Sequence, residues 1–156
     1  MTLQTKSPTH SEPISKERLR LWLKLLKASS LVEDEVRRRL RSECNWTLPR
    51  FDVMSALARK PEGLRMGEIS QLLRVSNGNV TVVVDKLAEE GLALRVAVPG
   101  DRRANLICLT PKGQALFAEH AQAHESWIDE LLGGLNADDI DGMILRLDHL
   151  TKSLEE

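Results

Sequence analysis

The chain has 156 residues, of which 42% are hydrophobic and 29% are charged, and this composition is typical of a small folded domain. No apolar run approaches the roughly 18–20 residues that a membrane-spanning helix needs, and the first residues lack the apolar segment of a signal peptide. Two cysteines, Cys44 and Cys108, are too few for a disulfide framework, so we expect a cytoplasmic protein.

Charge is distributed unevenly along the chain. Residues 1–47 carry 10 basic and 6 acidic side chains, and residues 48–110 carry 9 and 7. Residues 111–156 reverse the balance, with 3 basic and 10 acidic side chains. This asymmetry indicates a protein with one face toward a polyanion, although charged helix surfaces that only contact water would give the same counts.

The first predicted element is a long helix. Residues 1–14 are rich in Ser, Thr and Pro and are predicted to form a disordered arm. The helix then runs from Ser15 to about Ser42. Its apolar residues occupy more than one face, namely Leu19, Leu21, Trp22, Leu23, Leu25, Leu26 and Val32. Such breadth predicts contact with a partner chain as well as with the protein's own core.

Three shorter helices follow. The first has Pro49 in its opening turn and ends near Lys60, and the second covers about Met66 to Leu73 without a good capping residue. Ser76 is an N-cap for the third, which ends before Gly91. One face of this third helix is apolar, comprising Val80, Val83, Val84 and Leu87. The other face carries Gly78, Asn79, Thr81, Val82, Asp85 and Lys86.

A β-hairpin and two more helices complete the pattern. Residues 92–98 and 106–109 are β-prone runs on either side of the basic segment PGDRRAN. Thr110 caps the next helix, which ends at Gly133-Gly134, and a last helix begins at Asn136 or Asp138. The last helix has a long apolar stripe, formed by Ile140, Met143, Ile144, Leu147, Leu150 and Leu154. Pairing with a second copy of the chain would bury it.

This order predicts a mainly α fold with a small β-hairpin wing. It is a winged helix-turn-helix with a helical dimerisation region. The matching chemistry is that of duplex DNA, because a helix fits the major groove and a basic hairpin tip suits phosphate or the minor groove.

Three motifs give a more specific match. They are the D-R-R tip at residues 101–103, the D-K-L-x-x-x-G-L run at residues 85–92, and the L-T-x-x-G-x-x-L close at residues 109–116. Together they resemble the MarR family of bacterial transcriptional regulators over roughly residues 15–154. The resemblance implies a homodimer formed by residues 15–47 and 111–156, with residues 48–110 as the DNA-binding domain on a pseudo-palindromic operator.

The resemblance also implies which residues contact DNA. They are Arg74, Ser76, Asn77, Asn79, Thr81, Lys86, Arg102 and Arg103. Arg103 matches the wing arginine that enters the minor groove, and Arg102 would lie beside phosphate. Asn offers the donor and acceptor pair that an adenine edge requires, although Asn77 and Asn79 could instead cap the helix. Val82 stands where many members have arginine, which changes the expected operator.

Members of the family usually respond to a small molecule, so the resemblance implies a repressor that a ligand releases. Candidate effector-binding residues are Trp22, Trp46, Met54, Phe117, Trp127 and His124. An aromatic acid or an aryl-coenzyme A thioester would suit these apolar side chains. Each of them could equally be an ordinary core or dimer-interface residue.

The alternative sensing chemistries are metal binding and oxidation. His120 and His124 have the i, i+4 spacing at which two imidazoles can share a metal, and Cys44 could complete a site or act as a redox switch. Both histidines also fit an apolar stripe. Cys108 is expected to be a small buried hydrophobic residue.

Two other function classes fit the sequence less well. The sequence has no glycine-rich phosphate loop, nucleophile motif or catalytic carboxylate pair, so no enzymatic activity and no cofactor are expected. A winged helix used only for protein contact is the other rival. Arg102 and Arg103 argue against it, because a wing that does not contact DNA needs no adjacent cations.

Overall fold

The computed structural model describes residues 13–156, apart from the side chains of Arg102 and Arg103. The predicted arm therefore lies almost wholly outside the described residues. The described residues form two compact units, residues 13–35 and 36–156. Within the described residues, no helix is both long enough and apolar enough to cross a membrane.

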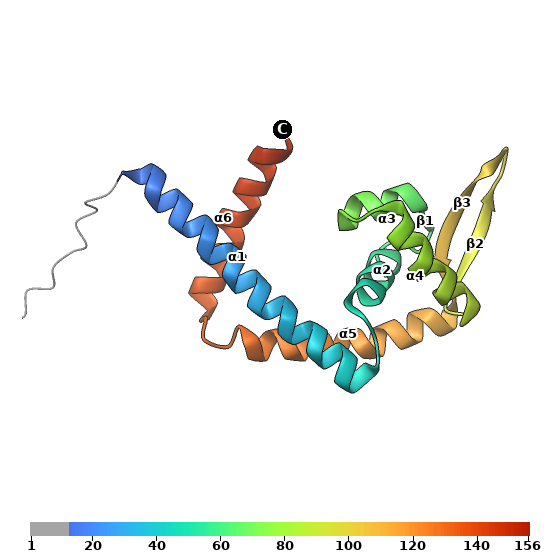
Figure 1. Ribbon diagram of the computed structural model, residues 1–156, viewed down its shortest axis with the longest axis horizontal. Helices are drawn as coiled ribbons and strands as arrows, with labels where there is room; N and C mark the ends of the chain where they lie inside the picture. Colours follow the sequence, from blue (N-terminus) through green and yellow to red (C-terminus); the bar gives the residue numbers. More distant parts are fainter. Residues whose placement is uncertain (1–12) are drawn as a thin grey trace, which may run out of the picture. The chain divides into compact units, whose positions relative to one another are not determined.

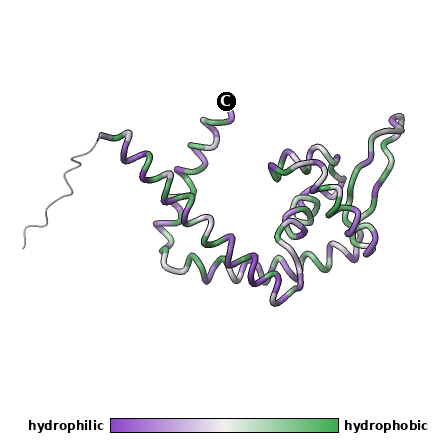
Figure 2. The backbone as a smooth tube through the Cα atoms, viewed as in Figure 1, coloured by the Kyte–Doolittle hydropathy of each residue, from purple (hydrophilic) through white to green (hydrophobic). Residues whose placement is uncertain are grey.

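Helix α1 (Ile14–Arg39) is the long helix that the sequence predicts. Apolar positions recur along it, as the hydropathy colouring in Figure 2 shows. Helix α1 continues into a short π-helix, η1 (Leu40–Cys44), which the sequence did not reveal. Asn45 then takes a left-handed conformation with φ of 54°, and the N–H of Trp46 donates to the Leu40 carbonyl at 3.1 Å. This turn ends the helix and leads the chain into α2.

The next two helices have their expected positions. Helix α2 (Leu48–Ala58) begins at Thr47, whose hydroxyl accepts from the Arg50 N–H at 3.3 Å. A two-residue strand, β1 (Leu64–Arg65), precedes α3 (Met66–Leu73) and was not predicted. The sequence shows no good capping residue for α3, but a backbone N–H at its N-terminal end does have a partner: the Glu68 carboxylate accepts from the Arg65 N–H at 3.1 Å.

Helix α4 (Asn77–Glu89) is followed by strands β2 (Ala93–Val98) and β3 (Asp101–Leu109). The three strands form an antiparallel sheet in the order β1-β3-β2 (Figure 1). We expected a seven-residue connection, but β3 already begins at Asp101, which pairs with Val98. Only Pro99 and Gly100 form the turn, and Gly100 has φ of +82°. Backbone pairing between the strands extends the hairpin through residues that look loop-like in sequence.

Helices α5 (Pro111–Leu131) and α6 (Ala137–Glu155) complete the chain. Thr110 caps α5, and Asn136 caps α6 together with Asp139 in a capping box. The core of the second unit lies among α2, α3, α4 and the sheet. Its most deeply buried side chains are Leu40, Val53, Met54, Leu57, Ile69, Val80, Val84, Leu87 and Ile107. The fold class is therefore confirmed: it is mainly α with a small β-hairpin wing.

Candidate nucleic-acid interface

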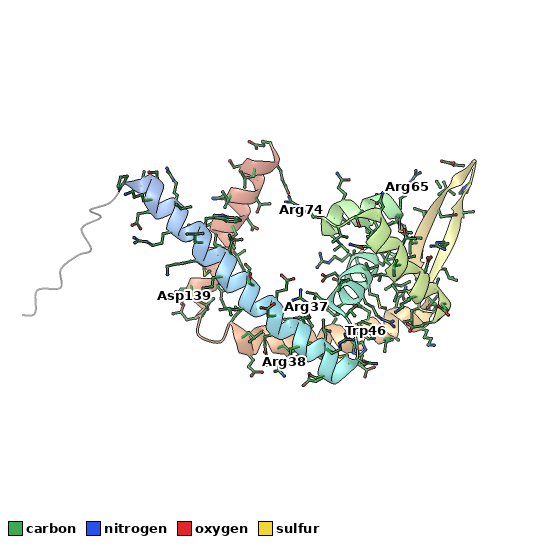
Figure 3. All side chains as sticks on the ribbon, in the orientation of Figure 1. Arg37, Arg38, Trp46, Arg65, Arg74 and Asp139 are labelled. Carbon is green, nitrogen blue, oxygen red and sulfur yellow. The ribbon has the colours of Figure 1, made fainter. Side chains whose placement is uncertain are left out.

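A tight turn joins α3 to α4. Arg74 ends α3 in a left-handed conformation with φ of 55°, and the N–H of Val75 donates to the Ser70 carbonyl at 3.1 Å. Arg74 and Arg65 lie at the two ends of α3 (Figure 3). The Ser76 hydroxyl then accepts from the Asn79 N–H at 3.3 Å, so Ser76 caps α4 as the sequence predicts. Two helices therefore meet through a three-residue turn, Arg74 to Ser76, the geometry of a helix-turn-helix.

One side-chain contact between these helices was not predicted. The hydroxyl of Ser70 on α3 lies 2.5 Å from Oδ1 of Asn77, the first residue of α4. The same hydroxyl is 3.2 Å from the Met66 carbonyl. The Ser70 hydroxyl links Asn77 to α3, so one edge of the Asn77 amide is occupied within the protein. The contact depends on how closely α3 and α4 pack, and the spacing of Ser70 and Asn77 in the sequence does not give that distance.

Helix α4 has two distinct faces. Val80, Val84 and Leu87 are at most 1% exposed and pack against the core. The opposite face is open to solvent and presents Ser76, Asn77, Gly78, Asn79, Val82, Asp85 and Lys86. Thr81 is half-buried at the border, and its hydroxyl donates to the Asn77 carbonyl at 2.8 Å. The structure therefore places five of the eight predicted DNA contacts on α4 or its cap, and four of these five are exposed.

The wing lies beside α4 (Figure 1). Arg102 and Arg103 belong to β3 next to the turn, although their side chains are outside the described part. An ion pair that the sequence did not reveal joins Arg95 of β2 to Asp85 on the exposed face of α4. A depression of about 350 Å³ also lies along the wing, lined by Arg65, Met66, Arg95, Asp101, Ala104, Asn105 and Ile107.

The junction between α4, the sheet and α5 explains the L-T-P-x-G motif. The Thr110 hydroxyl donates to the Gly91 carbonyl at 2.7 Å and accepts from the Gly113 N–H at 3.0 Å. The backbone of Gly113 passes so close to Leu92 that a Cβ atom there would lie 2.0 Å from the Leu92 carbonyl oxygen. Glycine is therefore required at position 113 by close approach of two backbones.

Comparison with known proteins agrees with this geometry. The MarR family profile matches residues 46–104. A MarR family transcriptional regulator from Silicibacter pomeroyi has a crystal structure that is similar over 92% of this chain and 99% of its own, with a TM-score of 0.75 and 30% identity. The chain belongs to the MarR family of transcriptional regulators.

Two further relatives are informative. The HTH-type transcriptional regulator MhqR of Bacillus subtilis is 26% identical over 82% of this chain and 87% of its own length. Sco3205, a MarR family regulator from Streptomyces coelicolor, was crystallised in complex with DNA. Its structure shares the fold with a TM-score of 0.75 at 20% identity, over 88% of this chain and 91% of its own. The relatives are DNA-binding regulators rather than enzymes.

The effector candidates of this MarR-family chain occupy different places. Trp22 is on α1 and is 55% exposed, whereas Met54 is completely buried within α2. Phe117 and His124 are half-buried on α5. Trp46 precedes α2 (Figure 3), and its ring is nearly buried beneath the Arg50 guanidinium at 4.9 Å. Arg50 in turn pairs with Glu90 at 2.5 Å, which lowers the pKa of that carboxyl through hydrogen bonding.

The rings of Trp46 and of Phe51 on α2 each contact rings on α5, and we call these two groups of contacts the aromatic layer. The ring of Phe51 lies 4.6 Å from His124 and 5.4 Å from Phe117, and the ring of Trp46 lies 4.2 Å from His120. Burial in this layer lowers the pKa of His124. Each predicted metal-binding histidine is thus in contact with an aromatic ring. In residues 13–156, no three His, Cys, Asp or Glu side chains are grouped as a metal site would require.

Cys44 is the residue suggested for redox sensing. Its thiol is half-buried in η1, and its pKa is raised mainly by burial and further by the charges of Glu43 and Glu119. A raised pKa keeps the thiol protonated, and the protonated form is the less reactive one. Cys108 lies on β3, where its sulfur is close to Gly63.

Proposed function

We propose that this MarR-family regulator is a homodimeric repressor that binds a pseudo-palindromic operator and releases it when a small effector binds. The observation that carries the proposal is the pair of faces on α4: one is buried in the core, and the other is exposed and largely polar beside a basic-tipped wing. The complex of Sco3205 with DNA supports this use of the shared fold. Because chromosomal DNA is the target, a cytoplasmic location is part of the proposal.

The proposed DNA contacts are those of the sequence prediction. They are Arg74, Ser76, Asn77, Asn79, Thr81, Lys86, Arg102 and Arg103. Asn79 and Lys86 are the strongest α4 candidates because both are exposed and their side chains can reach a base edge or a phosphate. Arg103 is proposed to enter the minor groove, whose negative potential favours a guanidinium. Thr81 and Asn77 already bond within the protein, so their role is to hold the helix start as well as to approach DNA.

The proposed dimer is supported by apolar surface on α1 and α6. None of the residues of α6 is buried, yet it carries a row of exposed large apolar side chains: Ile140, Met143, Ile144, Leu147, Leu150 and Leu154. Figure 2 shows these hydrophobic positions recurring along the helix. Such a surface is stabilised when a second copy covers it. Residues 15–47 and 111–156 are therefore the proposed dimerisation region, and residues 48–110 the DNA-binding domain.

The proposed effector site is the aromatic layer between α2 and α5. Three of its rings, Phe117, His120 and His124, are half-buried, and such a surface would suit an aromatic acid or an aryl-coenzyme A thioester. Arg50 beside Trp46 would bind the carboxylate by exchanging its present partner, Glu90. The proposed switch uses no cofactor.

Binding to duplex DNA from upstream of the chain's own gene tests the proposal. Fluorescence anisotropy across a salt series is expected to show a linear fall of log affinity with log salt, with a slope of about 0.9 for each phosphate neutralised. Arg103→Ala is expected to weaken binding while leaving the oligomeric state unchanged. Unaltered affinity of Arg103→Ala would remove the wing from the interface. Release of the duplex by one compound in a panel of aromatic acids and thioesters would identify the effector class.

A further inference from the structure

Val82 is the central residue on the exposed face of α4, and it is apolar. Its side chain is 62% exposed, although Val80 and Val84 on either side of it are at most 1% exposed. At 100° per residue, Gly78 and Lys86 lie about 40° to each side of Val82, one turn before and one turn after it. Nothing in residues 13–156 covers this valine.

Gly78 lies one helical turn before Val82 and has no side chain, so the backbone of α4 is accessible there. It lies inside the first turn of α4 without a positive φ, and a Cβ atom there would meet no protein atom within 4 Å. The fold therefore does not require glycine at this position, and alanine would suit a helix better. Gly78 and Val82 together form a small apolar step on the surface of α4, which we call the Gly78–Val82 step.

The polar residues around the Gly78–Val82 step limit the kind of chemical group that can contact it. Asp85 on the same face pairs with Arg95, so its carboxylate is turned to the wing. Asn79 and Lys86 flank the step with groups for a base edge and a phosphate. An apolar group set between such residues needs an apolar counterpart, because a polar base edge against Val82 would lose its hydrogen bonds to water.

We propose that the Gly78–Val82 step selects thymine in the operator by receiving its 5-methyl group. The thymine methyl is the one apolar group that base pairs present in the major groove. Gly78 permits the close approach and Val82 supplies the contact. This inference rests on the proposed function, since it requires α4 to lie in the major groove.

The test begins with selection of preferred duplexes from a random pool by the full-length protein. Each thymine of the preferred duplex is then replaced by deoxyuridine, which removes the methyl group and nothing else. For the unaltered protein, replacing the contacted thymine in one half-site is expected to lower affinity about fourfold, the value of one buried methyl group, and replacing it in both half-sites roughly 15-fold. Val82→Ala alters both half-sites of the dimer, so it is expected to bind the thymine duplex roughly 15-fold more weakly and to show no further loss with deoxyuridine at that position.

Gly78→Ala and Gly67→Ala form a matched pair. Each glycine is the second residue of a helix, and an added Cβ would meet no atom within 4 Å at either. Both variants are expected to melt at a higher temperature than the parent, because alanine favours the helix. Only Gly78→Ala is expected to lose affinity and sensitivity to deoxyuridine. Equal affinities of the two glycine variants would overturn the close approach at Gly78.

The outcomes separate the two proposals. If no duplex is enriched and binding to the pool is absent, both the proposed function and the thymine contact fail. If a preferred duplex emerges but deoxyuridine never matters, or matters equally in Val82→Ala, the thymine contact alone is overturned.

Discussion

Gly113 shows how one residue can hold three elements together. Its backbone lies against the Leu92 carbonyl, and Thr110 joins the same place to Gly91. We predict that Gly113→Ala destabilises the protein by about 1–3 kcal/mol, because the added methyl group must displace backbone rather than a flexible side chain. Urea denaturation followed by circular dichroism measures the change.

Gly67→Ala is the control for this substitution. It adds the same methyl group where no protein atom lies within 4 Å, so it is expected to raise stability slightly, because alanine favours the helix. If the two variants unfolded at the same urea concentration, the close approach at Gly113 would not exist in solution.

His124 gives the protein a predictable response to acid. Burial lowers its pKa below the ordinary value of 6.5, so the unfolded chain takes up the proton more readily than the folded one. The stability that the neutral ring contributes is therefore fully present above about pH 6.5 and is lost as the pH falls below it, until the folded pKa is passed.

His124→Phe isolates this effect, because phenylalanine preserves the stacking on Phe51 and cannot titrate. We expect the melting temperature of the variant to fall less than that of the parent between about pH 7.5 and pH 5. Parallel curves for the two proteins would mean that the imidazole does not enter the aromatic layer as described.

At the scale of elements, Ser76 has two roles that substitution can separate. Its hydroxyl caps α4, and it is a proposed DNA contact. Ser76→Ala is expected to cost about 1 kcal/mol of stability through loss of the cap. Ser76→Asp keeps a capping oxygen and favours the helix dipole, so its stability should match that of the parent.

In the proposed complex the aspartate of Ser76→Asp would lie against DNA phosphate, and the two negative charges would repel each other. The operator affinity of this variant is therefore expected to fall well below that of the parent. Thermal unfolding and duplex titration on the same samples compare the two variants. An aspartate variant that binds as tightly as the parent would place Ser76 away from DNA.

The elements that the sequence predicted well are those with strong local chemistry. Ser76 and Thr110 are caps whose hydroxyl groups determine where α4 and α5 begin, and both were predicted. Strand β1 escaped prediction because two residues show no alternation, and η1 because one extra residue in a turn leaves no periodic trace. Strand β3 starts earlier than predicted because cross-strand pairing, rather than local propensity, determines its length.

The candidate DNA-binding site was also predictable where local sequence determines it, and not where packing between elements does. The exposed positions of α4 follow from helical periodicity, since residues opposite the buried valines must face outward. The contacts Ser70–Asn77 and Asp85–Arg95 did not, because each joins elements whose separation is a property of packing. The proposed DNA contacts could therefore be predicted from the sequence, whereas the side-chain contacts that hold Asn77 and Asp85 in position could not.

At the scale of the whole molecule, the apolar row on α6 predicts the oligomeric state. Ile144 and Leu147 lie on the row, whereas Leu145 is at least as exposed as either but lies about 160° away from Leu147 around the helix. The parent is expected to be a dimer by light scattering. Ile144→Glu with Leu147→Glu should give a monomer, since charged side chains in an apolar interface cannot be solvated.

Leu145→Glu is the matched control and is expected to remain dimeric. Dissociation by both substitutions alike would show that charge on α6 in general, rather than the row, disrupts the dimer.

The junction at Thr110 and Gly113 has a consequence for operator architecture. Because α4, the sheet and α5 meet there through the Thr110 hydroxyl and the close approach of Gly113 to Leu92, each DNA-reading unit should turn as one stiff body. A stiff reader cannot adjust to a different spacer. Inserting one base pair between the half-sites rotates one against the other by about 35°. We expect that insertion to abolish simultaneous contact by both units, leaving the affinity of a single half-site.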